Sequence, residues 1–365
     1  MKQGKSMRSF FIGYVLLVSV AMVACMGCND SAKTSGQVLP ADSTMQSVNG
    51  NPLEQAKALQ ERGDIQGAIQ AYDRLLLQDP INIAALGNRA NLLQGEGDFK
   101  AALRDYNVLL EVDPSNVAAL MRRADLQVKL GQLAAALRDY DLMLSHRPDD
   151  ATLLNSRGEV HLQLGQAAKA AQDFQAALKL RPGWDAAVLN RAAVWYALGD
   201  FEQARTDYQA ILAAQPGNSE ATNGLGLITQ FVDGDLAAAE ELYRKAIFQD
   251  ARNAGAWYNL AFLEAGKGQS LKAIDDFGEA IRLDATYADA RLNRGLLHMQ
   301  VKLVGDAVAD FEAAVELRPD NAHAHLLLGW ARCEGGSRIQ GCLSLSKAKE
   351  LGDKDADNLI RQYCK

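Results

Sequence analysis

The five histidines are the first residues to consider for chemistry, because an imidazole can act as a base or a metal ligand near neutral pH. His161 and His298 fall at a position of the sequence pattern that Leu93 occupies elsewhere, which indicates residues that line the core. His323 and His325 are two residues apart, and on a helix such residues point to different sides. The sequence therefore predicts no histidine-based catalytic or metal site.

Other catalytic motifs are missing from the sequence as well. It contains no GxSxG nucleophile turn, no HExxH zinc motif and no GxxxxGK[ST] phosphate loop. Lys and Arg number 38 against 45 Asp and Glu, a net charge of −7, which argues against nucleic acid as a partner. We therefore expect a protein that is not an enzyme and that binds no cofactor, metal or nucleic acid.

Two cysteines near the start of the chain follow a segment with the outline of a secretory signal peptide. Three basic residues precede an uncharged run over residues 9–24, which is too short to span a bilayer comfortably, and Cys25 and Cys28 come next. Gly27 followed by Cys28 resembles the lipobox of bacterial lipoproteins. The resemblance implies a cleaved signal peptide over 1–27 and lipidation of Cys28, for example with palmitate. Cys25 is the alternative site, and an ordinary signal with incidental cysteines is the other interpretation.

The segment that follows has the composition of a flexible tether. Residues 28–50 are rich in Ser, Asn, Gly and Asp and show no periodicity. We therefore expect a protein of the bacterial cell envelope that contacts the membrane through its N-terminal lipid. The outer membrane is the favoured location, and the choice between its periplasmic and surface faces stays open.

One spacing organises the sequence from about residue 50 onward. Five prolines recur every 34 residues, and the next proline comes 103 residues later, which is three periods plus one. Recurrent Ala, Gly and aromatic residues show the same slip and place a one-residue insertion late in the first helix of the sixth unit. The prolines are Pro80, Pro114, Pro148, Pro182, Pro216 and Pro319.

The pattern within each period predicts two antiparallel helices. An apolar stripe through Leu86 and Ala90 is followed by a turn at Gly97 and then by a second stripe through Ala102 and Tyr106. A 34-residue period with Gly, Ala, an aromatic residue and Pro in this order resembles the tetratricopeptide repeat.

The resemblance implies an all-α fold, a right-handed α-solenoid of antiparallel helix pairs. Eight units fit within residues 51–321. Residues 322–365 fit a degenerate ninth repeat and a C-terminal capping helix, since a terminal repeat must expose one face to water.

The repetition also exposes a recurrent charged pair. Arg stands at the seventh position of several units and Asp follows sixteen residues later, and the two charges appear and vanish together except for Asp276, which faces Leu260. We interpret the pair as a structural bridge between the two helices of a unit. The pairs are Arg89 with Asp105, Arg123 with Asp139, Arg157 with Asp173, Arg191 with Asp207, and Arg294 with Asp310.

The resemblance further implies that the first helices line a concave groove that binds a partner. The groove stripe is polar in the N-terminal half, through residues such as Asn91, Asp125, Asn155 and Glu159, and apolar in the C-terminal half. If the apolar half binds a partner, its rings are expected to stay exposed; the alternative is that neighbouring helices bury them. The apolar groove residues are Leu189, Tyr196, Leu227, Phe231, Tyr258, Phe262, Leu292, Leu296, Met299, Leu326 and Trp330.

Three cysteines remain near the C-terminus, namely Cys333, Cys342 and Cys364. The last segment resembles a capping element of some bacterial tetratricopeptide proteins, and this resemblance favours a disulfide between Cys342 and Cys364. A bond between Cys333 and Cys342, or free buried thiols, are the other possibilities.

The sequence thus favours a non-enzymatic protein–protein interaction scaffold, anchored by lipid in the bacterial envelope. Its partner would be another protein or a peptide segment held in the concave groove. The alternative is a nutrient-binding or glycan-binding envelope lipoprotein, because some starch-binding lipoproteins contain helical repeats of this kind.

Overall fold

The computed structural model describes residues 51–365, which form helices and turns with no strand among them. The all-α solenoid predicted from the sequence is confirmed, since consecutive helices pack on one another as pairs. These residues belong to two compact units, the N-terminal unit over 51–198 and the C-terminal unit over 199–365. The predicted signal peptide and tether, with Cys25 and Cys28, lie outside the described residues.

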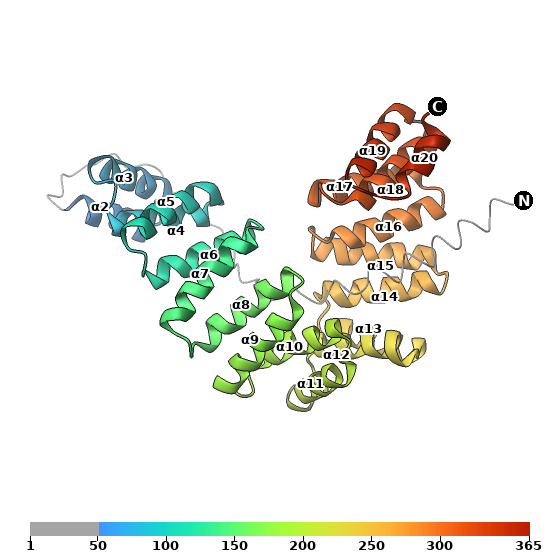
Figure 1. The fold of residues 1–365 in the computed structure, drawn as a ribbon, viewed down its shortest axis with the longest axis horizontal. Coiled ribbons are helices and arrows are strands. Elements are labelled where there is room, and N and C mark those ends of the chain that lie inside the picture. Colours follow the sequence, from blue (N-terminus) through green and yellow to red (C-terminus); the bar gives the residue numbers. More distant parts are fainter. Residues whose placement is uncertain (1–50) are drawn as a thin grey trace, which may run out of the picture. The chain divides into compact units, whose positions relative to one another are not determined.

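The N-terminal unit contains four helix pairs and one further first helix, which follow one another in chain order (Figure 1). The pairs are α2 (Pro52–Glu61) with α3 (Ile65–Gln78), α4 (Ile83–Gly95) with α5 (Phe99–Val112), α6 (Val117–Lys129) with α7 (Leu133–His146), and α8 (Ala151–Gln163) with α9 (Ala167–Leu180), followed by α10 (Asp185–Leu198).

The C-terminal unit begins with a second helix, continues with four helix pairs and ends with a short additional helix. They are α11 (Phe201–Ala214), α12 (Ser219–Ile228) with α13 (Leu236–Gln249), α14 (Ala254–Gly266) with α15 (Ser270–Leu283), α16 (Ala288–Gln300) with α17 (Val304–Leu317), α18 (Ala322–Glu334) with α19 (Arg338–Glu350), and α20 (Ala356–Tyr363). Among residues 51–365, no helix has the length and apolar character that crossing a membrane requires.

Side-chain caps and glycines set the ends of these helices. At the start of α4, Asn82 Oδ1 accepts a hydrogen bond from Ala85 N at 2.9 Å, and at the start of α5, Asp98 Oδ1 accepts one from Ala101 N at 3.0 Å. Gly97 between the two helices has φ +86°, a conformation that side chains with a Cβ rarely adopt. This turn is therefore specified by residues close to it in the sequence.

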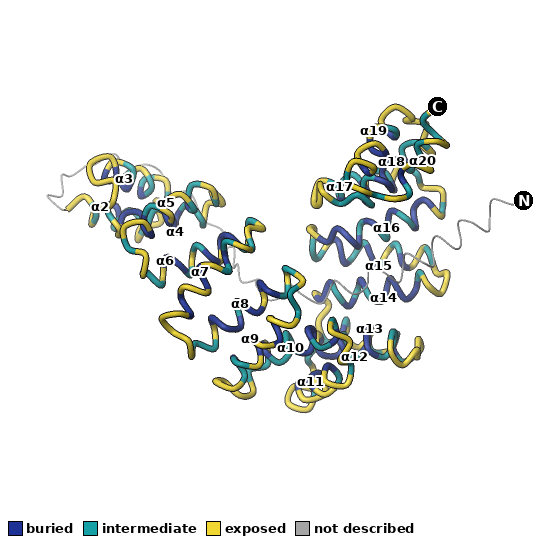
Figure 2. The backbone as a smooth tube through the Cα atoms, viewed as in Figure 1, coloured by how far each residue is buried: buried dark blue, intermediate teal, exposed yellow. Residues whose placement is uncertain are grey.

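The core runs along the contacts between successive helices, while the turns are exposed (Figure 2). The recurrent alanine and aromatic residue of a unit are buried together, as Ala102 and Tyr106 show. Where the aromatic residue is Phe174, its ring lies so close to α8 that a Cβ on Gly158 would be 2.7 Å from it. Small residues at these positions thus permit the close approach of the two helices.

The predicted one-residue insertion is present as a short π-helix, η1 (Thr229–Asp233), at the end of α12. The amide of Gly234 donates to the Thr229 carbonyl five residues earlier, and Gly234 then adopts a left-handed conformation with φ +74°. A π-turn accommodates one residue more than an α-turn, so the regular spacing resumes at Ala239 and Tyr243.

Candidate functional site

The structure joins four of the five predicted Arg–Asp pairs in bidentate ion pairs. Arg89 Nε and Nη2 donate to Asp105 Oδ2 and Oδ1 at 2.8 and 2.6 Å, although Asp105 is buried. Arg191 lies in the N-terminal unit and Asp207 in the C-terminal unit, and that pair stays a prediction. The same geometry joins Arg123 with Asp139, Arg157 with Asp173, and Arg294 with Asp310.

Three of these arginines have a third polar contact that the sequence analysis missed. Arg89 Nη1 donates to Asp73 Oδ1 at 2.6 Å, and Arg157 Nη1 donates to Asp141 Oδ1 at 2.7 Å. Arg123 Nη1 makes the equivalent contact with the amide oxygen of Asn107. Each acceptor lies sixteen residues before its arginine, so the same spacing searched in the other direction would have found it. One guanidinium therefore connects two successive repeats.

Two of the histidines, His161 and His298, pack beside these pairs. His161 and His298 are buried, and the ring Nδ1 of His298 is 3.1 Å from Asp310 Oδ2. Burial lowers the pKa of His323, whose Nδ1 lies 3.5 Å from Asp353. Over residues 51–365, no group of three His, Cys, Asp or Glu residues is placed to hold a metal ion.

The expectation of exposed rings along the apolar groove residues is wrong for most of them. Tyr258 is 4% exposed and Phe262 is 8% exposed, and only four of the eleven residues keep intermediate exposure. The buried ones are Tyr196, Leu227, Tyr258, Phe262, Leu292, Met299 and Leu326, and the intermediate ones are Leu189, Phe231, Leu296 and Trp330.

Stacking between rings from neighbouring elements explains this burial. Within the C-terminal unit, the Tyr258 ring stacks on Tyr287 with centroids 4.9 Å apart and meets the edge of Phe277 at 5.5 Å. Phe262 on α14 contacts Phe231 in η1 with centroids 6.1 Å apart. Large aromatic side chains from α14, α15 and the start of α16 thus reach one another and form core.

The polar half of the groove is different, because several of its side chains stay exposed. Here we define the polar stripe as Asn91 on α4, Asp125 on α6, Asn155 and Glu159 on α8, and Asn190 on α10. Asn91, Asp125 and Glu159 are exposed, Asn190 is intermediate and Asn155 is buried. The polar stripe therefore runs over four successive first helices of the N-terminal unit.

Hydrogen bonds hold the polar stripe in place from beneath and from the side. The buried hydroxyl of Tyr106 donates to Asn91 Oδ1 at 2.8 Å. Glu159 Oε1 accepts from Asn155 Nδ2 and from Asn190 Nδ2, both at 2.8 Å, and the second bond joins α8 to α10. These bonds orient the Glu159 carboxylate, and Glu159 remains exposed.

The polar stripe carries two carboxylates in a partly desolvated setting. Burial raises the pKa of Asp125, and a hydrogen bond from Tyr140 and the charge of Arg122 offset part of that effect. Burial also raises the pKa of Glu159, and the charge on Asp125 adds to it. Lys129, the last residue of α6, has its ammonium 4.2 Å from the Phe99 ring centroid.

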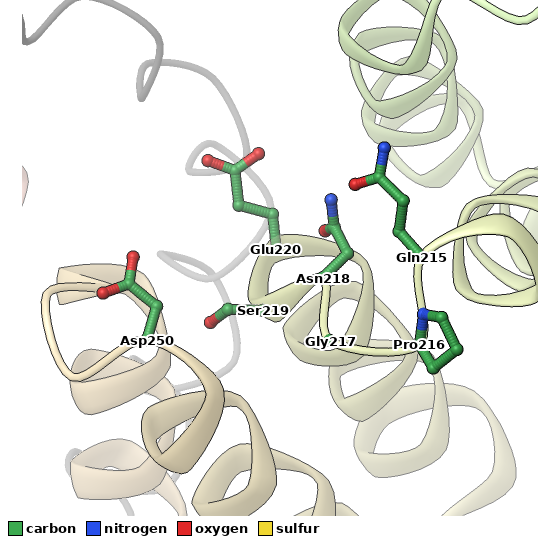
Figure 3. Close-up of a pocket in the computed structure, with 7 residues that line it drawn as sticks. All are labelled: Gln215, Pro216, Gly217, Asn218, Ser219, Glu220 and Asp250. Atoms are coloured by element: carbon green, nitrogen blue, oxygen red, sulfur yellow. The ribbon is translucent and has the colours of Figure 1, made fainter.

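A separate depression of about 540 Å³ lies at the edge of the C-terminal unit (Figure 3). It is formed by the loop before α12, the first turn of that helix and the end of α13. Ser219 Oγ donates to the Ala246 carbonyl and accepts from Asn253 Nδ2, so its hydroxyl is used within the fold. The lining residues are Gln215, Pro216, Gly217, Asn218, Ser219, Glu220 and Asp250, and they include no nucleophile paired with a base.

A disulfide joins Cys342 on α19 to Cys364 after α20, with their Cα atoms 5.7 Å apart. This is the pairing that the sequence favoured. Arg338 on α19 also donates to the carbonyls of Tyr363 and Lys365. Cys333 is a free thiol, and burial raises its pKa.

Comparison with known proteins agrees with this architecture. A tetratricopeptide repeat family model matches residues 53–93, 88–145, 122–185, 189–256 and 292–337, and a second model of the same description matches residues 254–287. The fold is similar to that of a tetratricopeptide repeat protein from Parabacteroides merdae, with a TM-score of 0.61 and 22% identity. That alignment covers 67% of this chain and 97% of the other.

Two curated proteins match shorter stretches. A UDP-N-acetylglucosamine–peptide N-acetylglucosaminyltransferase of Giardia intestinalis is 34% identical over 68 residues, which are 19% of this chain and 5% of that protein. DnaJ homolog subfamily C member 7 of Mus musculus is 31% identical over 101 residues, 27% of this chain and 20% of that protein. The family models, which together match more than half of the sequence, show that the chain belongs to the tetratricopeptide repeat family.

Proposed function

We propose that this chain is a non-enzymatic scaffold that holds a segment of a partner protein along the polar stripe of its N-terminal unit. Tetratricopeptide repeats support a role in protein–protein interaction. The observation that carries the proposal is the row of exposed polar side chains on α4, α6 and α8, oriented by hydrogen bonds from buried tyrosines and neighbouring asparagines.

The chemistry of the polar stripe favours a partner segment that carries Lys or Arg. When they are ionised, the Asp125 and Glu159 carboxylates can accept hydrogen bonds but cannot donate them. Their hydrogen bonds within the N-terminal unit come from neutral groups, such as the Tyr140 hydroxyl and the Asn190 amide, and neither carboxylate forms an ion pair there. Amide groups such as Asn91 can pair with the backbone of an extended segment. A basic, extended peptide would therefore satisfy both features, with electrostatic attraction speeding its association.

We also propose that the mature chain is attached to the bacterial envelope by a lipid on Cys28. The lipobox resemblance supports this location. The disulfide between Cys342 and Cys364 is compatible with it, since such bonds persist in oxidising compartments and are rare in the cytosol.

Site-specific photo-crosslinking tests the binding surface. A photoreactive residue in place of Asn91 should capture a partner in intact cells, while the same residue in place of Glu111, exposed on the second helix α5, should not. Asp125→Lys with Glu159→Lys should abolish capture. The matched control, Glu111→Lys with Asp149→Lys, changes the net charge equally and should preserve it. Equal loss in both charge-reversal variants, or equal capture from α5, would exclude the polar stripe as the binding surface.

A further inference from the structure

Asp276 on α15 is the one aspartate of the recurrent pattern whose own unit lacks the arginine. Leu260, buried on α14, stands where Arg89, Arg157 and Arg294 supply a guanidinium in other units. In those units, both carboxylate oxygens of the aspartate accept hydrogen bonds from the arginine. Asp276 must therefore be stabilised in another way.

Its neighbour is a second carboxyl group, that of Glu264, which is fully buried on α14. Glu264 Oε1 accepts from Arg244 Nη2 at 3.0 Å and from Lys272 Nζ at 2.5 Å. Glu264 stands four residues after Leu260, the position that His298 holds on α16, where the ring lies 3.1 Å from the aspartate of its own unit. Glu264 therefore faces Asp276 across the hairpin. Two acidic groups thus meet in the space between α14 and α15.

A proton is the missing partner in this contact. Glu264 Oε2 and Asp276 Oδ2 are both buried, and neither has a nitrogen or hydroxyl donor. Two ionised carboxylates cannot donate to each other, so a hydrogen bond between them requires one of them to be protonated. We propose that Asp276 and Glu264 share one proton at neutral pH. Loss of this proton at higher pH lowers the stability of the α14–α15 hairpin, so this repeat responds to pH.

If both Asp276 and Glu264 were ionised, the nearby cations would compensate their second negative charge poorly. From α13, Arg244 reaches Glu264 but is also bound to Glu240, at 2.8 Å. Lys267, in the turn between the helices, is bound to the other oxygen of Glu240 at 2.6 Å. Lys272 on α15 forms an ion pair with Glu264, with its Nζ 2.5 Å from Oε1.

On the other side of the hairpin, Arg294 and His298 of α16 are engaged by the aspartate of their own unit. Arg294 on α16 approaches Gly278 of α15, but its Nε and Nη2 are engaged by Asp310. His298 also contacts Asp310 and not the carboxyl pair. Arg291, the remaining cation of α16, donates through Nη2 to the Ala285 carbonyl, and its Nε has no hydrogen-bond partner. None of these three groups is bound to the carboxyl pair.

The direction of the pH effect follows from the state in which the proton is held. Burial, followed by the contact with Glu264, raises the pKa of Asp276 from 3.8 to about 7, and Lys272 and Arg244 offset part of that rise. The folded chain keeps this proton up to near neutral pH, whereas an unfolded chain releases it near pH 3.8. The pair therefore stabilises the fold fully at low pH, and this contribution is lost as the pH rises through about 7.

Hydrogen exchange resolved by segment tests the proposal on the whole chain. After correction for intrinsic rates, protection of α14 and α15 should fall about tenfold or more between pH 5.5 and pH 8, while α16 and α17, held by Arg294 and Asp310, should change little. Asp276→Asn, which cannot ionise, should remove most of the fall. The control Asp275→Asn, at the exposed neighbouring residue, should keep it. An equal fall in the unmodified chain and in Asp276→Asn would overturn the proposal.

A second measurement uses the unmodified chain, so it does not depend on whether a variant folds. Carbon-13 NMR of the aspartate carboxyls in the unmodified chain should show one group that titrates near pH 7, well above the usual aspartate value of about 3.9. If every aspartate in the folded chain titrates below about pH 5, the carboxyl pair holds no proton at neutral pH and the proposal is wrong.

Discussion

Arg157 and Asp173 form a bidentate bridge between the two helices of their repeat, with Nε to Oδ2 at 2.9 Å and Nη2 to Oδ1 at 2.6 Å. The aspartate is buried, and the arginine keeps partial exposure. These hydrogen bonds raise the pKa of Arg157 above its ordinary value. A buried carboxylate without its cation lowers the stability of the fold, so the guanidinium compensates the cost of burying Asp173.

A double-mutant cycle on this pair should show strong coupling. Arg157→Leu and Asp173→Leu should each lower the free energy of unfolding by about 3 to 5 kcal/mol, because each leaves a partner unsatisfied. The double variant should lose clearly less than the sum of the two, measured by urea denaturation. Strict additivity would show that the bridge contributes nothing to stability.

The third contact of Arg157 should be worth much less. The carboxylate of Asp141 lies 2.7 Å from Arg157 Nη1, but its side chain is 62% exposed to solvent. Water screens such a pair, so Asp141→Asn should lower the free energy of unfolding by less than about 1 kcal/mol. The same urea series provides the comparison with Asp173. A loss as large as that of Asp173→Leu would mean that the connection between repeats dominates.

Phe262 should behave as a core residue. Its ring is buried and contacts Phe231 and Tyr258, so Phe262→Ala should cost about 3 kcal/mol or more through the cavity that it leaves. The control is Leu271→Ala at a strongly exposed residue of α15, which should change stability by less than about 0.5 kcal/mol. Thermal and urea denaturation measure both. If Phe262→Ala is as stable as the control, the Phe262 ring is not part of the core and becomes a candidate for partner binding again.

Reduction of the disulfide should release the C-terminal helix before the rest of the chain unfolds. The bond closes a loop with a sequence separation of 22, and a cross-link of that length stabilises by about 3 kcal/mol. Limited proteolysis with and without reductant should show a new cleavage within α20 on reduction. Without reductant, Cys333→Ser should give the same cleavage pattern as the unmodified chain, whereas Cys342→Ser should show the new cleavage in α20. If Cys342→Ser also gives the pattern of the unmodified chain, the prediction is wrong.

Replacing the predicted acylated residue should detach the protein from membranes. In Cys28→Ser, labelling with radioactive palmitate and retention in the membrane fraction should both be lost, whereas Cys25→Ser should keep both. The opposite pattern would move the site to Cys25. Normal palmitate labelling in a variant that carries both Cys25→Ser and Cys28→Ser would exclude a lipid on either cysteine.

The sequence predicted those features that a fixed spacing expresses. The 34-residue period placed the helix pairs and the insertion that η1 accommodates, because turns and caps depend on nearby residues, as Gly97 and Asp98 show. The recurrence of Arg and Asp sixteen residues apart likewise identified partners that the structure joins, for example Arg157 and Asp173.

Features that depend on the meeting of several elements were not predictable in the same way. Tyr258 is on the groove stripe by helical position, yet its burial results from stacking on Tyr287 and Phe277. Similarly, the sequence showed that Asp276 lacks its arginine, but only packing reveals that the buried Glu264 is its neighbour. Spacing gives the face on which a residue lies, and neighbouring side chains decide whether water reaches it.

The position of the guanidinium contacts bears on how such a chain can change in length. Arg157 contacts Asp173 of its own unit and Asp141 of the unit before, and Arg123 contacts Asp139 and Asn107 at the same two places. Among the units of Arg89, Arg123 and Arg157, gain or loss of one whole unit would again leave each arginine with an acceptor sixteen residues before and sixteen residues after it. This stretch of the array can therefore grow or shrink by recombination in whole units while the contacts between its repeats are preserved.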